Sequence, residues 1–535
     1  MKAVASLLAT ATMAAVAATV GCAAPPGAWP AEPDAATAVA PQGRAPEDKA
    51  TGKATGAATD EAIQGSLERA GPNRPEIERY LDRYENHADA DQRLASRWLV
   101  ANMPGHGFAL MALQRPDRTR VDFEATDHPN LAAAQAELDA LVEREGPLRF
   151  GLERFTEDLT VITAEELITN HEQAFASWRS APWSSSVSLP TFLEHILPYR
   201  GSSEPVDIAW RAEANARLAP ALAALRASLD REPTLAEATQ AARKAAKKWV
   251  RFRQLFYLHP TDQSWSELMR STAGRCEDQS NVAVFAARSI AAVVAGDFTP
   301  YWADRDNNHA WEVALDANGK GSATLAHRPA KVYRRMFGIQ PNSLGAMRAP
   351  GEAIPPGLGE RTLLDVTEQY VEVSDLSIEV GSPPAGQRFA YLCVFNAGAW
   401  RPVHHALVRD GVARFTAMGR DILYLPAWHA PDGVVAAGAP FILTGDGTRE
   451  VLAPSLERQP LLLDMDGAAR GDTRELDVWA SSSGEWTAIE LPSPTAGEPS
   501  ITVDVPAGGL FWLHDPQGRG LERPFTVVNG RMRRW

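Results

Sequence analysis

The stretch GRCEDQSNVAVFAARS, residues 274–289, joins a glycine–arginine turn to a strongly helical run. Glu277 and Asp278 stand in the predicted first turn, where acidic side chains interact favourably with the helix dipole. Cys276 therefore begins the helix, and the unsatisfied backbone N–H groups there favour its thiolate form. Arg275 adds positive charge beside the thiol, whereas the two carboxylates oppose it. Position alone leaves open whether Cys276 is a nucleophile or a small buried hydrophobic residue.

The composition limits the class of protein. A chain of 535 residues is too long for one core, so we expect two to four domains. The net charge of −14, without a basic stripe, argues against nucleic-acid binding. The three cysteines, Cys22, Cys276 and Cys393, are too few for a disulfide framework and form no zinc-binding pair. Cys393 lies in the apolar run AYLCVF, which predicts a buried structural thiol.

The N-terminal sequence predicts a targeting signal followed by a flexible tether. Residues 1–21 have the charge and the apolar stretch of a secretory signal peptide. The sequence TVGC resembles the lipobox of bacterial lipoproteins, which implies lipidation of Cys22, although Thr19 stands where that pattern prefers Leu. Residues 22–63 lack apolar periodicity and indicate a flexible tether. Ala23 after the cysteine implies, by resemblance to known sorting rules, an outer-membrane anchor facing the periplasm or the surface.

The rest of the chain predicts an α+β multidomain fold in several zones. Apolar residues at three- and four-residue spacing predict a helical region over 64–250. Helix and strand patterns mix over 251–360. Short apolar runs at 8–12-residue spacing predict a β-sandwich over 361–455 and a second, small one over 456–535.

A histidine that follows Cys276 in the sequence is the candidate base. His309 opens the alternating run HAWEVALD, which predicts a strand, and DANGKG after it predicts a hairpin turn. A helix that carries Cys at its start, followed by a strand that carries His, allows thiol and imidazole to meet across a helix–sheet layer. The imidazole would then take the thiol proton and return it to a leaving amine.

The whole run from Gly274 to Asp316 resembles the core of the transglutaminase-like superfamily, which has a papain-like Cys–His arrangement. The RC…D context, the aromatic-rich strand and the HAW step carry this resemblance. The phrases RWLVANMPGHGF, LEHILPYRGSSEPVDIAWR, AYLCVFNAGAWRPV and MGRDILYLPAW resemble a secreted bacterial subset of that superfamily. The resemblance implies that Cys276 is the nucleophile and His309 the general base and acid.

At the third catalytic residue this sequence differs from the superfamily. The superfamily has an Asp on the strand after the histidine strand, but here that segment reads GSATLAHRPA and holds no carboxylate. A hairpin about Asn318 would instead place His309 opposite His327 or Arg328. We name Asp316 as the third catalytic residue, although its position also suits a turn-forming residue. The alternatives are Asp297, Asp306, His327 and an Asn.

Several further residues are candidates for the cleft. Trp302 and Trp311 would form its walls or, as aromatic residues in such strands more often do, pack in the core. Gln263 would help the Cys276 N–H group to stabilise an oxyanion. The loop PYRGSSEP, residues 198–205, would either close over it or be a plain loop. Arg275 and His327 complete the candidate set.

Three functions compete. The first is a cell-envelope cysteine enzyme that cleaves or transfers an amide in a protein, peptide or glycopeptide; a hydrolase (peptidase or amidase) is favoured over an amine-crosslinking transferase. The second is a catalytically degenerate lipoprotein that binds protein or glycan through its β-sandwiches, which the missing strand Asp favours. The third is a structural envelope lipoprotein. The sequence holds no cofactor signature and no metal-site motif.

Overall fold

The computed structural model describes residues 59–431, 433–464, 474–492, 500–515 and 522–535. The predicted signal peptide, Cys22 and most of the tether lie outside these ranges. Helix α2 (Asp60–Ala70) is capped by Thr59, so the folded part begins before residue 64. Among the described residues no helix has both the length and the hydropathy needed to cross a bilayer.

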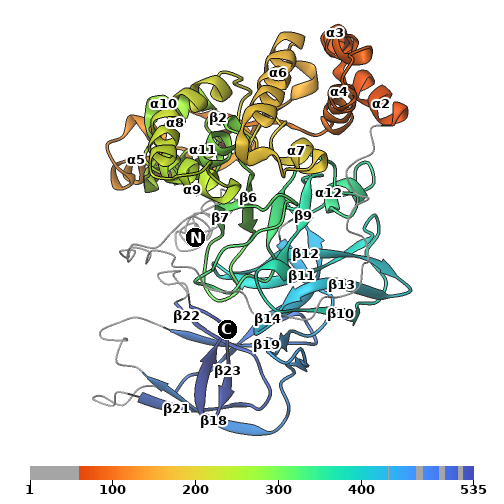
Figure 1. The fold of residues 1–535 in the computed structure, drawn as a ribbon. Helices are drawn as coiled ribbons and strands as arrows, with labels where there is room; N and C mark the ends of the chain where they lie inside the picture. Colours follow the sequence, from red (N-terminus) through yellow and green to blue (C-terminus); the bar gives the residue numbers. More distant parts are fainter. Residues whose placement is uncertain (1–58, 432, 465–473, 493–499, 516–521) are drawn as a thin grey trace.

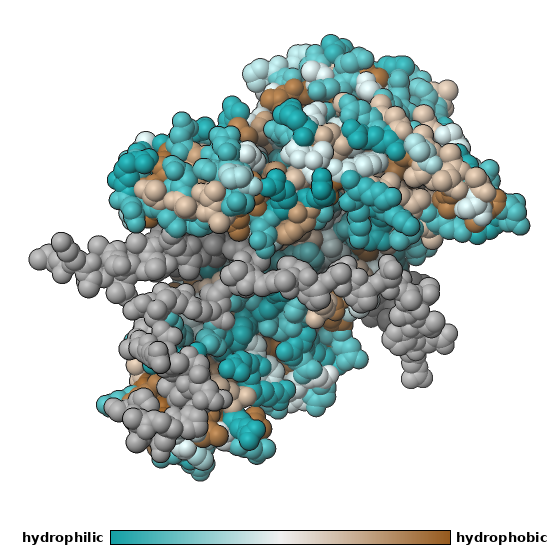
Figure 2. Space-filling model, turned by 90° about the vertical axis from the view of Figure 1, so that its left-hand side faces the viewer, coloured by the Kyte–Doolittle hydropathy of each residue, from teal (hydrophilic) through white to brown (hydrophobic). Residues whose placement is uncertain are grey.

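The chain is an α+β protein, with helices gathered in its N-terminal half and sheets in its C-terminal half (Figure 1). After α2 the helices are α3 (Arg74–Glu85), α4 (Ala90–Asn102), α5 (Leu131–Glu145), α6 (Ala164–Ser180), α7 (Leu189–His195), α8 (Trp210–Ala227), α9 (Leu235–Ala246), α10 (Trp265–Ser271), α11 (Cys276–Ser289) and α12 (Leu344–Met347). On the face in Figure 2, hydrophilic residues cover both halves, with apolar residues in small groups between them.

Side-chain caps fix where these helices begin. Thr163 and Glu166 form a capping box at the start of α6, and Thr234 and Glu237 form another at α9. Asp89 caps α4 by accepting the N–H of Asp91. Such caps satisfy backbone donors that have no partner inside the helix.

The helical region also contains a small sheet, which the sequence analysis did not predict. Its strands are β1 (Gly107–Gln114), β2 (Arg120–Val121) and β3 (Arg149–Glu157), in the order β2-β1-β3. Leu113 and Phe150 of this sheet share an apolar cluster with Leu138 and Leu141 of α5. The prediction of an all-helical 64–250 region is therefore wrong over this segment.

Helix α11 is enclosed by the protein. Every residue from Ser280 to Ser289 is buried, and α8, α9, β6 (Val294–Thr299) and β7 (His309–Ala314) all pack against the helix. Short strands β4 (Arg251–Phe252) and β5 (Ala273–Gly274) pair in parallel just before it. The helix that opens the candidate site is thus the central element of this part of the fold.

A four-stranded sheet lies next to α11, in the order β7-β6-β8-β9, with β8 spanning Tyr333–Arg335 and β9 spanning Leu363–Asp365. Strand β8 pairs with β6 rather than with β7. The predicted hairpin about Asn318 does not form, because the 321–330 segment contributes only an isolated bridge between Trp302 and Pro329. Strand β7 is consequently an edge strand, and His309 has no strand residue opposite it on that side.

The C-terminal half consists of sheets, as the run spacing predicted. One sheet has the order β10-β13-β12-β11-β14-β16-β17, with β15 paired to β14. Its strands are β10 (Val373–Glu379), β11 (Phe389–Asn396), β12 (Ala399–Arg409), β13 (Val412–Gly419), β14 (Ile422–Ala430), β15 (Gly433–Ala436), β16 (Phe441–Leu443) and β17 (Arg449–Val451). Strand β11 is buried along its whole length, and Cys393 within it is fully buried, as expected for a structural thiol. Burial raises the pKa of the Cys393 thiol.

The remaining strands form two further sheets after residue 455. Strand β18 (Arg458–Asp464) pairs with β21 (Ser500–Pro506), and the other sheet has the order β20-β19-β22-β23-β24. Its strands are β19 (Glu475–Ala480), β20 (Glu485–Ile489), β22 (Phe511–His514), β23 (Phe525–Val528) and β24 (Arg531–Arg534). Both sheets contribute to one apolar core, which includes Leu461, Val503 and Phe511.

The buried ion pair between Asp297 of β6 and Arg334 of β8 gives a first prediction. Both carboxylate oxygens accept hydrogen bonds from the guanidinium at 2.8 Å. In Asp297→Ala the buried cation loses its partner, so the free energy of unfolding should fall by about 3–5 kcal/mol in urea denaturation. Glu450→Ala, at an exposed position of β17, is the control and should change it by less than about 0.5 kcal/mol. An equal effect of both substitutions would contradict the assignment.

Glu194 of α7 gives a second prediction, on pH. Burial raises the pKa of this carboxyl to about 7, although it accepts the N–H groups of Phe337 and Gly338. A raised folded-state pKa means that the stabilisation is complete below the unfolded pKa of about 4.3 and is lost as pH rises through about 7. Glu194→Gln should remove this loss, so the variant should gain stability relative to wild type by up to about 3 kcal/mol between pH 4.5 and 8. Parallel stability–pH curves for the two proteins would refute this.

Candidate active site

Cys276 is the first residue of α11, and a network of backbone contacts holds that end of the helix in place. Asp278 accepts the N–H of Arg275 at 2.9 Å and that of Gln263 at 3.3 Å. A Cβ on Gly274 would lie 2.5 Å from the Asp278 Cβ, so only glycine fits beside this cap. The thiol residue itself is 8% exposed.

The charges around the thiol form a connected chain. The Sγ of Cys276 lies 3.2 Å from Oε2 of Glu277, and the same oxygen is 3.4 Å from Nε of Arg275. Arg275 also donates to Asp262 at 2.5 Å. Asp262 thus offsets the Arg275 charge, so this cation favours the thiolate less than its place in the sequence indicates.

The same surroundings change the pKa of the Glu277 carboxyl. Burial, first, and the neighbouring Cys276 raise the pKa of the Glu277 carboxyl to about 8, against the lowering effect of Arg275. The carboxyl is therefore largely protonated near neutral pH. In that form it places no negative charge beside the sulfur and has a proton to donate to a thiolate.

The topology places His309 at the same end of the helix–sheet unit as Cys276. Helix α11 is about 20 Å long, and β6 returns over a similar distance after a short connection. Thr299 ends β6 and pairs with His309, which opens β7. Both strands pack against α11, so the histidine lies at the level of the start of the helix.

The predicted cleft aromatics gather around His309. The Trp302 ring lies 6.2 Å from the His309 ring and 5.5 Å from His327, and Trp311 lies 5.6 Å from His309. Trp302 and Trp311 are nearly buried, at 5% and 8% exposure. The indole N–H of Trp311 donates to the Tyr370 hydroxyl. These rings form a rigid wall against one side of the imidazole.

The choice of Asp316 as third catalytic residue is wrong. Asp316 is exposed and lies beyond the far end of β7, about 20 Å along the strand from His309. Its carboxylate accepts the N–H groups of Asn318 and Lys320 and so shapes the turn. A turn-forming aspartate at that distance has no contact with the imidazole.

The residues named as alternatives for the third catalytic position contact other partners. Asp297 lies on the same face of the sheet as His309, but it binds Arg334 and Tyr370. Asp306 accepts the N–H of Ala397 at 2.6 Å, and His327 lies beside Asp304 and Arg305. Within the described residues no side-chain hydrogen bond to the His309 ring is present.

Gln263 does not have the predicted oxyanion role. It is 4% exposed, its amide donates to the Ala273 carbonyl, and it accepts a hydrogen bond from Ser271. Both ends of the amide are therefore used to hold the segment before α11. The backbone N–H of Cys276, at the first position of the helix, stays the candidate oxyanion donor.

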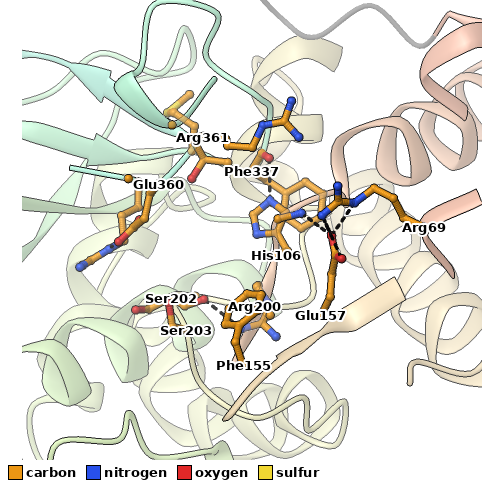
Figure 3. A pocket seen from close by; sticks show the side chains of 18 of the residues that line it. Arg69, His106, Phe155, Glu157, Arg200, Ser202, Ser203, Phe337, Glu360 and Arg361 are labelled. Carbon is orange, nitrogen blue, oxygen red and sulfur yellow. Dashed lines mark hydrogen bonds and ion pairs between the residues drawn. The ribbon is translucent and has the colours of Figure 1, made fainter. Parts of the chain in front are cut away.

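A pocket of about 520 Å³ lies beside this site, and its wall contains neither Cys276 nor His309 (Figure 3). Ser202, Ser203 and Arg335 form part of the wall. Ser202 donates to Asp262, which accepts from Arg275 next to the thiol. The pocket and the thiol are thus joined by a short chain of side chains.

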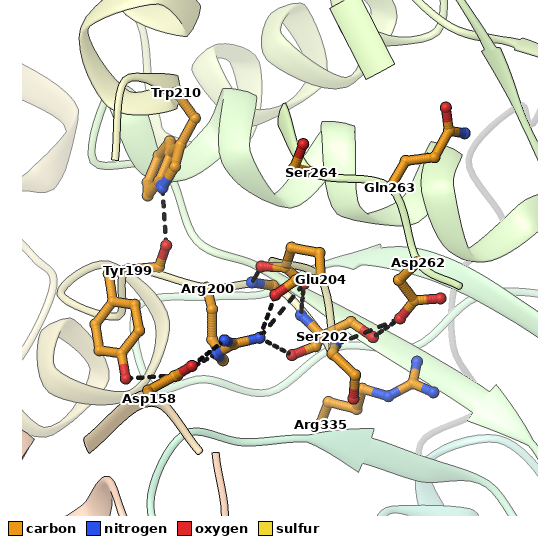
Figure 4. Close-up of polar contacts among 12 residues, drawn as sticks. Asp158, Tyr199, Arg200, Ser202, Glu204, Trp210, Asp262, Gln263, Ser264 and Arg335 are labelled. Carbon is orange, nitrogen blue, oxygen red and sulfur yellow. Dashed lines mark hydrogen bonds and ion pairs between the residues drawn. The ribbon is translucent and has the colours of Figure 1, made fainter. Parts of the chain in front are cut away.

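The loop over 198–205, predicted to close over the cleft, is instead a fixed wall (Figure 4). Arg200 and Glu204 are 3% and 2% exposed. Arg200 binds Asp158, and Glu204 accepts the N–H groups of Gly201 and Ser202. A loop with this many internal bonds holds its shape. Its Gly and Pro residues identified it as a loop, but they did not indicate the buried charges.

Comparison with known proteins gives no further assignment: no family model matches the chain, and neither curated proteins nor solved structures yield a match. Among the described residues no group of three or more His, Cys, Asp or Glu side chains is arranged to hold a metal ion. The site is therefore interpreted from its own residues.

The Glu277 contact gives a third prediction. In Glu277→Gln, with Cys393→Ser as background, no carboxylate can ionise next to the sulfur at alkaline pH. The thiolate becomes easier to form, so the pH profile of iodoacetamide alkylation should shift to lower pH. Glu450→Gln is the control and should leave the profile in place. A profile that stays unchanged or moves to higher pH in Glu277→Gln would show that the carboxyl does not control the thiol.

Proposed function

We propose that this chain is a transglutaminase-like cysteine enzyme of the cell envelope, which acts on an amide bond through an acyl-enzyme at Cys276. The observation that carries the proposal is the placement of Cys276 at the start of a buried helix, with His309 at the same end of the sheet packed against it. This arrangement is the one that the papain-like core of the superfamily uses. The helical region and the C-terminal sheets on either side of it suit a large substrate.

In the proposed reaction His309 takes the thiol proton while Sγ attacks the amide carbon. The S–C bond forms, the C–N bond breaks, and the amine leaves with the proton returned by His309. Water then gives a proton to His309 and attacks the thioester. The S–C bond breaks, the acid leaves, and the thiol regains its proton. Hydrolysis is favoured over amine transfer, so the enzyme is a peptidase or amidase acting on protein, peptide or glycopeptide.

The proposed location rests on the sequence. The lipobox resemblance at Cys22 supports a lipid anchor, and Ala23 supports the outer membrane, with the body facing the periplasm or the surface. The segment between the lipid and α2 would act as the tether.

One observation favours the second candidate, a degenerate binding protein. The described residues supply no hydrogen-bond partner to orient the His309 imidazole, and the loss of such a partner from a catalytic triad lowers the rate strongly. In that case the C-terminal sheets would bind protein or glycan. The chemistry of the Cys276 thiol separates the two candidates.

The test is the rate of Cys276 alkylation by iodoacetamide at pH 7 in the Cys393→Ser background. If His309 stabilises the thiolate, His309→Ala should slow labelling at least about tenfold. His429→Ala, on β14, is the matched control and should leave the rate unchanged. Slow labelling that is indifferent to His309 would exclude the enzyme and leave the binding protein.

A further inference from the structure

Most of the charged side chains that line the pocket beside the candidate site are cations. It lies between the start of β1, the end of β3, the 198–205 loop and the segments around α12 and after β8 (Figure 3). The arginines in its wall are Arg69, Arg200, Arg288, Arg335, Arg348 and Arg361, and its wall carboxylates are Glu157 and Glu360. A cavity with this lining concentrates positive potential.

Three of these arginines have carboxylate partners. Arg69 pairs with Glu157 at 2.9 Å, Arg200 pairs with Asp158 just outside the wall at 2.5 Å, and Arg335 approaches Glu360 at 3.8 Å. Within each pair the positive and negative charges offset each other. The net charge of the pocket therefore depends on the other three arginines.

The other three arginines have no carboxylate in ion-pair range among the described residues. Arg288 donates to the carbonyls of His195 and Arg200, and the buried carboxyls of Glu194 and Glu204 act on its charge from a longer distance. Arg348 and Arg361 form no ion pair within the part of the chain that the structure describes. These two arginines are therefore the candidates for binding an anion.

Arg361 passes close to Gly105 in the wall of the pocket. Its Cδ lies 3.3 Å from where a Cβ on Gly105 would stand, and Gly105 has φ +93°, which favours glycine. Burial, first, and the neighbouring Arg69 and Arg348 lower the pKa of Arg361. A bound anion would relieve the repulsion between these cations.

We propose that this pocket binds a ligand through an oxyanion group, a carboxylate or a phosphate, held by Arg348 and Arg361. Guanidinium groups match both anions with paired N–H donors. Ser202 and Ser203 supply further polar groups in the wall, and Phe155, 48% exposed, supplies apolar surface for the ligand's carbon skeleton.

The position of the pocket gives the ligand a role, and this step rests on the proposed function. Ser202 contacts Asp262, which binds Arg275 beside Cys276. A substrate whose anionic end lies in the pocket would extend past this chain of side chains toward the thiol. The favoured substrate of the cysteine enzyme is then an amide compound that carries an acidic group.

The test is calorimetric titration of the full chain with citrate, a tricarboxylate, and separately with inorganic phosphate at low ionic strength. The Cys276→Ala protein is titrated beside wild type, so that binding is measured without any turnover. Arg361→Ala should weaken binding at least about tenfold, since a charge-assisted contact is lost. Arg348→Ala should act in the same direction, and because Arg348 is exposed it leaves the packing intact. Arg409→Ala, at an exposed end of β12, is the control and should bind as wild type.

The outcomes separate the two proposals. Binding of citrate alone supports a carboxylate ligand, and binding of phosphate alone supports a phosphorylated one. Binding of neither anion, or binding that both arginine variants leave unchanged, overturns the pocket assignment. Because Cys276→Ala keeps the pocket, anion binding with an unreactive thiol would refute the enzyme and retain the site.

Discussion

The enclosure of α11 is the constraint on which the rest of this structure depends. The helix is buried from Ser280 onward and the segments that lead into it are buried as well, so backbone N–H groups in those segments need partners from the protein. Asp278 does this for Arg275 and for the preceding segment, and Arg275 in turn needs Asp262 and Glu277. The charges next to Cys276 thus follow from the burial of the helix, whatever chemistry the thiol performs.

Local signals predicted much of this fold. The start of α11 at Cys276 and the short strands of the C-terminal half were predicted in this way, because each is encoded within a few residues. Strands β1 and β3 were missed, although β1 is a run of apolar residues, because a short apolar run fits a buried helix as well as a strand. Partners distant in sequence were also missed: β8 pairs with β6 and leaves β7 at the edge.

In the candidate site, too, local sequence predicted some features, and those that depend on distant residues were missed. Cys276 and His309 are close enough in sequence for one helix–strand connection to place them at one end of the unit. Asp316 follows His309 closely in sequence, but a strand of six residues carries it away from the histidine. The arginine pocket was not predicted, since its residues extend from Arg69 to Arg361 and no local pattern unites them.

The contacts of α4 and α7 with the segment after β8 have a consequence for biosynthesis. Asn102 of α4 accepts the N–H of Ile339, and buried Glu194 of α7 accepts those of Phe337 and Gly338. The donors of these hydrogen bonds leave the ribosome more than 140 positions later. In a chain ending near residue 250 these bonds cannot form, and each contributes about 0.5–1.5 kcal/mol. The helical region is therefore completed during synthesis only after the four-stranded sheet has begun to form.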